Sequence, residues 1–233
     1  MIFKIVTLFP DFFSSVFQSG LLGKAIKNGI VSVEVVDLRN YSEDRYHRCD
    51  DYPYGGGAGM VLKPEPVFKA ISANKTKGAK VIYASPGGVP FNQELAHSFK
   101  KENELIILCG NYEGIDQRAI DSLVDVEVSV GDYILSGGEY AACIFVDAIS
   151  RLFPGFMSNE ESILHESFET GLLEYPQYTR PAEYNGLHVP NVLISGNHAA
   201  IDTWRHEESI KKTKRVRPDL YKKYLKSITS EES

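Results

Sequence analysis

Residues 129–140 read SVGDYILSGGEY, and the chain changes here from a strand to a helix. Apolar residues between Val128 and Leu135 favour a strand, and the apolar run 141–149 is typical of a helix. Between them, Ser136-Gly137-Gly138-Glu139 interrupts the pattern, and a glycine pair at such a junction allows close approach to the backbone. Neither G-x-G-x-x-G nor G-x-x-x-x-G-K-[ST] is present, so neither familiar nucleotide fingerprint explains this turn.

On both sides of this stretch, predicted strands alternate with predicted helices. Strands are expected at 3–9, 31–38, 80–85, 105–109 and 126–130, and helices at 10–28, 64–73, 91–101, 115–123 and 138–153. The alternation predicts an α/β domain with a mainly parallel sheet. Continuously apolar strands such as VIYAS (81–85) fit a sheet covered on both faces. Residues 39–62 are predicted to form a long loop, and loops of that length often have a function.

Three predicted strand ends carry glycine turns: SPGG (85–88), CGNYEG (109–114) and the segment from GDY to SGGE (131–139). In open α/β sheets, ligands bind at the carboxyl ends of the strands. Each of these segments alone is better explained as a plain turn. Together they predict one pocket that is lined by backbone N–H and C=O groups.

The composition limits the class of protein. The 233 residues, of which 43% are apolar, suffice for a sizeable core, and no run of 18 apolar residues predicts a membrane span. The N-terminus MIFKIVTLFP is too short and too soon interrupted for a signal peptide. The three cysteines, without C-x-x-C spacing, indicate a reducing cytosol and argue against a disulfide framework or a zinc site.

Charge is distributed unevenly along the chain. The net charge is −6, but residues 196–227 contain nine Lys/Arg and four Asp/Glu, so that segment is +5 and the remainder −11. This asymmetry indicates an appendage that binds a polyanion, although a solvated helical face gives the same pattern. Basic helices are expected at about 199–212 and 218–227. The predicted organisation is an α/β domain at 1–155, a polar linker at 156–174 and a small helical domain at 175–233.

The segments YGGGAGM (54–60), SPGG, CGNYEGIDQR (109–118), VGDYILSGGE (130–139), GLLEYPQYTRP (171–181) and LISGNHAAIDTWR (193–205) share order and spacing with one family. The chain resembles the bacterial tRNA (guanine-N1)-methyltransferases over essentially its whole length. This resemblance implies methylation of N1 of guanosine 37, immediately 3′ of the anticodon. It also implies a homodimer with its active site at the subunit interface. The implied SPOUT-type fold has a deep trefoil knot, which the usual rule against knotted chains would exclude.

The resemblance implies that the glycine turns hold S-adenosylmethionine in a bent shape, with its adenine recognised by backbone groups. Such a cofactor carries a sulfonium and no phosphate, which explains the missing phosphate fingerprints. The positions that match the family's cofactor contacts are Tyr83, Ser85, Pro86, Gly110, Tyr112, Glu113, Val130, Gly131, Tyr133, Leu135, Gly137, Gly138 and Glu174. Ala141 stands where the family often has proline. A role for magnesium is also implied, although no cluster of oxygen ligands predicts a dedicated metal site.

Methylation of guanine N1 requires a base for the departing proton and a cation or donor for the charge that develops at O6. By resemblance the base is Glu166 in His165-Glu166-Ser167-Phe168, where the family has aspartate, and the cation is Arg151. Glu113 is expected beside the methyl donor and guanine. Without the resemblance, Arg151 and Glu113 read as charges that complement helix dipoles, and Glu174 as a solvated acid.

The target base must leave its stack to be methylated, and Asp50 is expected to hydrogen-bond it. The positions expected to bind tRNA or this base are Asp50, Gly55, Gly56, Gly57, Gly59, Arg180, His198, Arg205, Lys211, Lys212, Lys214 and Arg215. The glycine loop alone would read as a flexible linker, and Trp204 either stacks on a base or belongs to a core. A non-enzymatic RNA-binding module is the rival prediction. A nucleotide-dependent small-molecule enzyme is a third, which predicts ATP or NAD binding.

Overall fold

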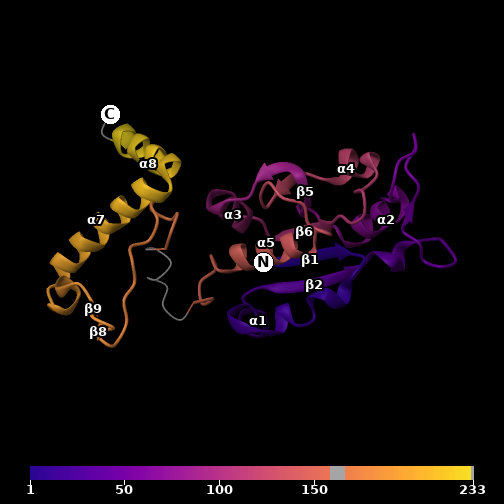
Figure 1. Cartoon of the computed structure of the whole chain (residues 1–233). Coiled ribbons are helices and arrows are strands. Elements are labelled where there is room, and N and C mark those ends of the chain that lie inside the picture. Colours follow the sequence, from indigo (N-terminus) through magenta and orange to yellow (C-terminus); the bar gives the residue numbers. More distant parts are fainter. Residues whose placement is uncertain (158–165, 232–233) are drawn as a thin grey trace. The chain divides into compact units, whose positions relative to one another are not determined.

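The computed structural model describes residues 1–157 and 166–231 (Figure 1). His165 lies outside the described residues. The chain forms two compact units, Met1–Ser158 and Asn159–Ser233.

The first unit is built on one five-stranded sheet (Figure 1). In spatial order its strands are β2 (Ser32–Asp37), β1 (Ile2–Thr7), β6 (Glu104–Cys109), β5 (Lys80–Pro90) and β7 (Val126–Ser129). Every pair of neighbouring strands in this sheet is parallel. The predicted α/β class with a mainly parallel sheet is therefore confirmed, and the strands β6, β5 and β7 that carry the glycine turns are neighbours.

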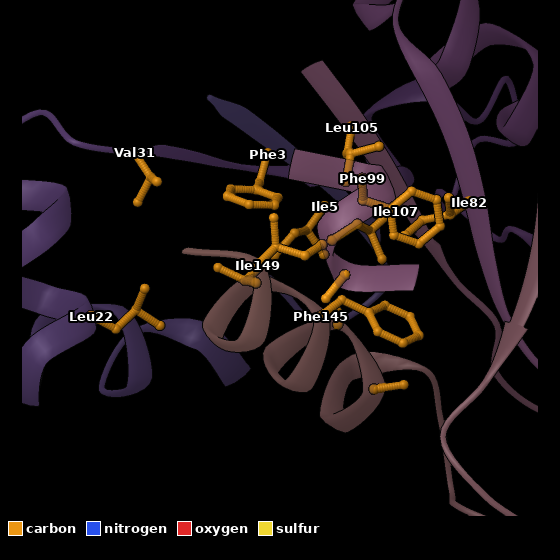
Figure 2. Packing of buried hydrophobic residues seen from close by; sticks show 14 of the residues in the cluster. Phe3, Ile5, Leu22, Val31, Ile82, Phe99, Leu105, Ile107, Phe145 and Ile149 are labelled. Carbon is orange, nitrogen blue, oxygen red and sulfur yellow. The ribbon is translucent and has the colours of Figure 1, made fainter. Parts of the chain in front are cut away.

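Helices cover both faces of the sheet. They are α1 (Gly20–Lys27), α2 (Pro64–Asn74), α3 (Gln93–Lys100), α4 (Gln117–Leu123) and α5 (Glu139–Ser150). Successive side chains of a strand point to opposite faces, so Leu105 and Ile107 belong to one core and Ile106 to the other. The first core includes residues of α1, α3 and α5, and the second includes residues of α2 and α4. Figure 2 shows Ile107 in the first core with Phe145 of α5.

The prediction of a single helix at 10–28 is wrong. The segment forms two short 3₁₀ turns, η1 (Pro10–Phe13) and η2 (Val16–Gln18), before α1 begins. Gly20 has a φ of +64°, which ends the preceding turn in a conformation that other residues rarely adopt. The chain then folds closely on itself, because a Cβ on Gly23 would lie 2.5 Å from the carbonyl carbon of Gln18.

Two predicted strand ends also need correction. β5 continues to Pro90 through a register shift between Ala84 and Val89, so SPGG lies in an irregular strand rather than in a turn after it. A Cβ on Gly88 would lie 2.3 Å from the backbone N of Val128 in β7, which explains glycine at this position. The strand predicted to run toward Leu135 ends at Ser129 instead.

The predicted loop 39–62 contains more structure than expected. It begins in η3 (Leu38–Tyr41), and β3 (Asp50–Asp51) pairs with β4 (Val61–Leu62) in an antiparallel ladder. Cys49, beside β3, is fully buried in the second core. The loop is therefore anchored at its base, and its glycine-rich part lies between the two short strands.

The second unit is mainly helical. It contains a hairpin of β8 (Glu183–Tyr184) and β9 (Leu187–His188), the turn η4 (Asn191–Ile194), and the helices α7 (His198–Val216) and α8 (Pro218–Glu231). Both basic helices were predicted and are confirmed, with longer bounds.

The described part of the predicted linker is held at both ends. Near its beginning, Phe156 is buried in the first core. In the second unit, Leu173 donates its backbone N–H to Thr213 Oγ1 of α7 at 2.8 Å, and Lys212 Nζ donates to the carbonyl of Glu174 at 2.8 Å. Residues 166–174 are thus fixed to α7.

Candidate functional site

A cavity of about 260 Å³ lies at the carboxyl ends of β5, β6 and β7. The predicted cofactor positions of the first unit that line it are Tyr83, Ser85, Pro86, Gly110, Tyr112, Glu113, Val130, Gly131, Tyr133, Leu135, Gly137 and Gly138. Asn111, Ser129 and Ile134 line it as well, although the sequence did not single them out as site residues, and Ala141 also lines it. The three glycine segments thus form one pocket, as their positions after neighbouring strands led us to expect.

The glycines of this cavity are required by close packing. A Cβ on Gly138 would lie 2.8 Å from Cys109 Cα, and one on Gly110 would lie 2.8 Å from Tyr83 Oη. The backbone N–H of Gly138 donates to the carbonyl of Gly110 at 2.8 Å, which joins the turn before α5 to the end of β6. Without side chains in the way, backbone donors and acceptors form much of the wall.

Aromatic side chains complete the wall. Tyr83 is buried, and burial, followed by the nearby charge of Glu127, raises the pKa of its hydroxyl. Tyr133 folds over Gly131 and donates its hydroxyl to the carbonyl of Val130 at 3.0 Å. None of the described residues that line the cavity is lysine or arginine. The cavity therefore lacks the cationic side chains that commonly bind phosphate.

A buried acid lies behind this wall. Glu139, the first residue of α5, is only 4% exposed. Its Oε1 accepts hydrogen bonds from Thr7 Oγ1 at 2.7 Å and from Asn111 Nδ2 at 2.9 Å. Neither Glu139 nor Asn111 was predicted as a site residue. The signal for Glu139 was its place directly after the glycine pair.

The loop with the YGGGAGM signature contacts the NYEG turn. The backbone N–H of Glu113 donates to the carbonyl of Met60 at 3.0 Å, and that of Leu62 donates to Gly114 at 2.9 Å. The Glu113 side chain lies over Gly59, where an added Cβ would meet Glu113 Cγ at 2.5 Å. The two motifs, 50 residues apart in the sequence, are therefore neighbours beside the cavity.

The other predicted base-binding positions of this loop differ in their surroundings. Asp50 is half-buried in β3, opposite Leu62 of β4. Gly55, Gly56 and Gly57 are exposed, have positive φ values and have nothing within 4 Å of an added Cβ. Packing does not require glycine at these three positions, whereas the backbone conformation does.

Arg151 is distant from the cavity along its own helix. It caps the C-terminus of α5, whereas Gly138 and the cavity lie at the N-terminus. A helix of 12 residues is about 18 Å long. Burial raises the pKa of Asp147, one turn earlier in the helix, and the charge of Arg151 opposes that rise. Arg151 is not among the residues that line the cavity of its own chain.

Glu166 and Glu174 belong to the second unit, whereas the cavity belongs to the first. The carbonyl of Glu166 accepts from the backbone N–H of Glu169 at 3.3 Å, and Ser167 Oγ accepts from the N–H of Glu174 at 3.0 Å. The carboxylate of Glu174 accepts from Gln177. Glu166 therefore begins, and Glu174 ends, the compact turn that is fixed to α7.

The predicted tRNA-binding positions of the second unit are partly engaged with neighbours. Lys211 Nζ contacts Glu208 at 2.8 Å, and Arg205 lies over the Tyr175 ring at 5.0 Å. Trp204 is half-buried and 6.3 Å from the Tyr178 ring, which favours a packing role. The remaining predicted positions that are exposed are Arg180, His198, Lys214 and Arg215.

Two negative findings apply to the described residues only. No group of three or more His, Cys, Asp or Glu in residues 1–157 and 166–231 is arranged to hold a metal ion. No helix within the same ranges is long and apolar enough to cross a membrane.

Comparison with known proteins gives one consistent result. The family described as tRNA (Guanine-1)-methyltransferase TrmD matches residues 1–223. A tRNA (guanine-N(1)-)-methyltransferase of Lachnospira eligens is 53% identical over 99% of both chains. The protein of that name in Borrelia turicatae is 52% identical over 95% of this chain and 93% of its own, and that of Listeria monocytogenes serovar 1/2a is 51% identical over 94% and 91%. By its motifs, its glycine-lined cavity and these matches, the chain belongs to the tRNA (Guanine-1)-methyltransferase TrmD family.

Proposed function

We propose that this protein transfers a methyl group from S-adenosylmethionine to N1 of guanosine 37 in tRNA. The observation that carries the proposal is the cavity at the ends of β5, β6 and β7, in which all the first-unit positions matched to the family's cofactor contacts meet. Family membership over residues 1–223 supplies the reaction class.

The cavity suits this cofactor. Its backbone groups can hydrogen-bond an adenine. Among the described residues that line it there is no lysine or arginine, the side chains that would favour a phosphate. When bound, S-adenosylmethionine supplies a methyl group on a positively charged sulfur, which becomes neutral on transfer. The glycines place no side chains in the volume that the cofactor would occupy.

Three side chains are proposed for the chemistry, Glu166, Arg151 and Glu113, of which Glu113 lies beside the methyl donor and guanine. The carboxylate of Glu166 accepts the proton from guanine N1, and the guanidinium of Arg151 stabilises the charge that develops at O6. Because Arg151 lies at the far end of α5 from the cavity, one chain does not supply a complete site. A homodimer in which the second chain completes each cavity resolves this, and it also accommodates Glu174 as a cofactor contact.

We propose that tRNA binds to the second unit through the exposed basic residues of α7. Lys214 and Arg215 are exposed there, and phosphate contacts by such residues supply affinity without sequence preference.

Two features of the chain's organisation also stay proposals. They are the deep trefoil knot and the division into residues 1–155, 156–174 and 175–233. A cytoplasmic location stays one as well, and so does the role of magnesium, which assays with and without a chelator will test.

The deciding experiment is methyl transfer from labelled S-adenosylmethionine to unmodified tRNA. One substrate carries guanosine at position 37 and its control carries adenosine. We expect label only in the first, recovered as 1-methylguanosine. Cofactor binding without transfer to either tRNA would refute the substrate, and failure to bind the cofactor would favour the rival, a non-enzymatic RNA-binding module.

A further inference from the structure

Glu139 is a buried carboxyl group that pairs with no basic side chain among the described residues. Its two hydrogen-bond partners, Thr7 and Asn111, are neutral. The N-terminus of α5 stabilises the carboxylate, but only as a fraction of a unit charge. An ionised side chain that is buried without a counter-ion costs free energy unless some other group compensates it.

The field of this carboxylate reaches its surroundings. Burial first, and then the charge of Glu139, raise the pKa of Cys143 to about 11. The same two causes raise the pKa of the buried Cys109 thiol. Cys109 ends β6, the central strand of the sheet, at the strand end where the cavity lies.

The carboxylate is separated from the cavity only by a glycine. A Cβ built on Gly137, which lines the cavity, would lie 2.3 Å from Glu139 Oε2. The same Cβ would lie 2.5 Å from Asn111 Oδ1, another atom of the wall. Glu139 itself is not a lining residue. Its charge therefore acts on a ligand through one layer of backbone, in a region with little water to screen it.

We propose that Glu139 is the counter-charge that makes this cavity prefer a positively charged cofactor to its neutral product. The inference rests on the proposed function and deepens it. A sulfonium in the cavity is attracted to the buried carboxylate. Methyl transfer removes the positive charge from sulfur, and with it this attraction, so product leaves more readily than cofactor. Glu139 contacts no reacting atom, and it acts as a positioning and selectivity residue.

The test compares two ligands that differ in this charge. The affinities of the full-length protein for S-adenosylmethionine and S-adenosylhomocysteine are measured by calorimetry for the wild type and for Glu139→Gln. The amide oxygen can still accept from Thr7, whereas the charge is gone. We expect the variant to lose about tenfold in affinity for the sulfonium and less than about twofold for the neutral product.

Thr7→Val is the matched control, because it removes one donor to Glu139 and keeps the charge. Its effects on the two ligands are expected to be equal. Equal losses for both ligands in Glu139→Gln, or no loss, would overturn the counter-charge and leave a purely structural role. A wild type that binds neither ligand would instead refute the proposed function.

A second pair of variants keeps the inference testable if Glu139→Gln does not fold. Cys143 is half-buried and one helical turn after Glu139, so Cys143→Lys places an ammonium in reach of the carboxylate. We expect this variant to show the same selective loss for the sulfonium. Cys143→Met, of similar length without charge, is expected to affect both ligands equally, and a selective loss there would contradict the proposal.

Discussion

At the scale of single residues, the cavity depends on glycines for packing. Gly138→Ala would place a Cβ 2.8 Å from Cys109 Cα and 3.1 Å from Gly110 N. Both obstacles are backbone atoms in the core of the sheet, so they cannot rotate away. Overpacking of this kind costs about 1–3 kcal/mol. We expect the variant to lose that stability in urea unfolding and to lose S-adenosylmethionine binding.

Gly87→Ala, in the irregular part of β5, is the control from another of the three glycine segments. Its Cβ would meet only Ser85 Oγ, at an ordinary 3.7 Å, and its φ is not in the left-handed region. The free energy of unfolding is expected to change by less than about 0.5 kcal/mol. An effect of Gly138→Ala as mild as that of Gly87→Ala would contradict the close approach of Gly138 to Cys109.

Glu166 can be tested by separating catalysis from binding. We expect Glu166→Gln to lower the rate of methyl transfer by about 10²–10⁴-fold, because the amide cannot accept the N1 proton. Affinity for S-adenosylmethionine should stay near that of the wild type. Glu166→Asp restores the residue that the family has at this position, and it is expected to remain active. Near-normal turnover by Glu166→Gln would remove Glu166 from the mechanism.

Residue patterns predicted that three glycine segments form one cavity, but not the groups behind its wall. The individual cofactor positions expected in the first unit came from the family resemblance, and the structure brings them together at that cavity. Asn111 and Glu139 were missed because a motif shows where the backbone turns, whereas their hydrogen bonds join segments 28 and 132 residues apart. Nothing local in the sequence reports such a partner.

At the scale of elements, α4 follows the CGNYEGID motif and begins at a charged cap. Asp116 Oδ1 accepts from the backbone N–H of Arg118 at 3.0 Å, and its carboxylate pairs with the Arg118 guanidinium at 2.7 Å. The hydrogen bond from the Arg118 side chain is the largest cause of the lowered pKa of Asp116. Both contacts favour the ionised acid at the start of the helix.

The sign of the pH dependence follows from that lowered pKa. Asp116 contributes stability that is present above its unfolded pKa and is lost as the pH falls through its folded pKa. We therefore expect Asp116→Ala to cost about 1 kcal/mol at pH 7, with a smaller difference from the wild type as the pH falls below about 4. Urea unfolding of both proteins at pH 7 and pH 3 measures this. A difference that is larger at pH 3 would contradict it.

The elements themselves were predictable where one local pattern sufficed. The strands of the sheet and the helices α2 to α5 follow from apolar runs and spacing. The breaks at 10–28 did not, because they depend on the positive φ of Gly20 and on the close contact between Gly23 and Gln18. The extension of β5 did not either, because it depends on a strand that is distant in the sequence. Gly88 continues β5 against Val128 of β7, and that pairing crosses 40 residues. Apolar spacing within a window of ten residues cannot reveal a contact over that distance in the sequence.

At the scale of the whole molecule, sequence pattern predicted two units of different charge but no topology beyond a parallel sheet. Alternating strands and helices are compatible with many chain paths, and a knot changes neither the apolar spacing nor the turns. The family resemblance alone implied it. The same holds for the homodimer, since an exposed apolar residue such as Ile144 in α5 does not by itself identify its partner.

A shared active site makes a prediction that a single-chain site does not. If Glu113 of one chain works with the arginine at position 151 of the other, then Glu113→Ala and Arg151→Ala inactivate each homodimer in different ways. In a heterodimer of the two variants, one site combines the intact residue of each chain, and the other site carries both defects. Co-expression at equal levels makes about half of the dimers mixed, so the preparation should recover about a quarter of wild-type methyl transfer. Separately purified homodimers of each variant serve as the inactive controls. If both residues acted within one chain, every site in the mixture would lack one of them, and the co-expressed protein would be as inactive as its parents.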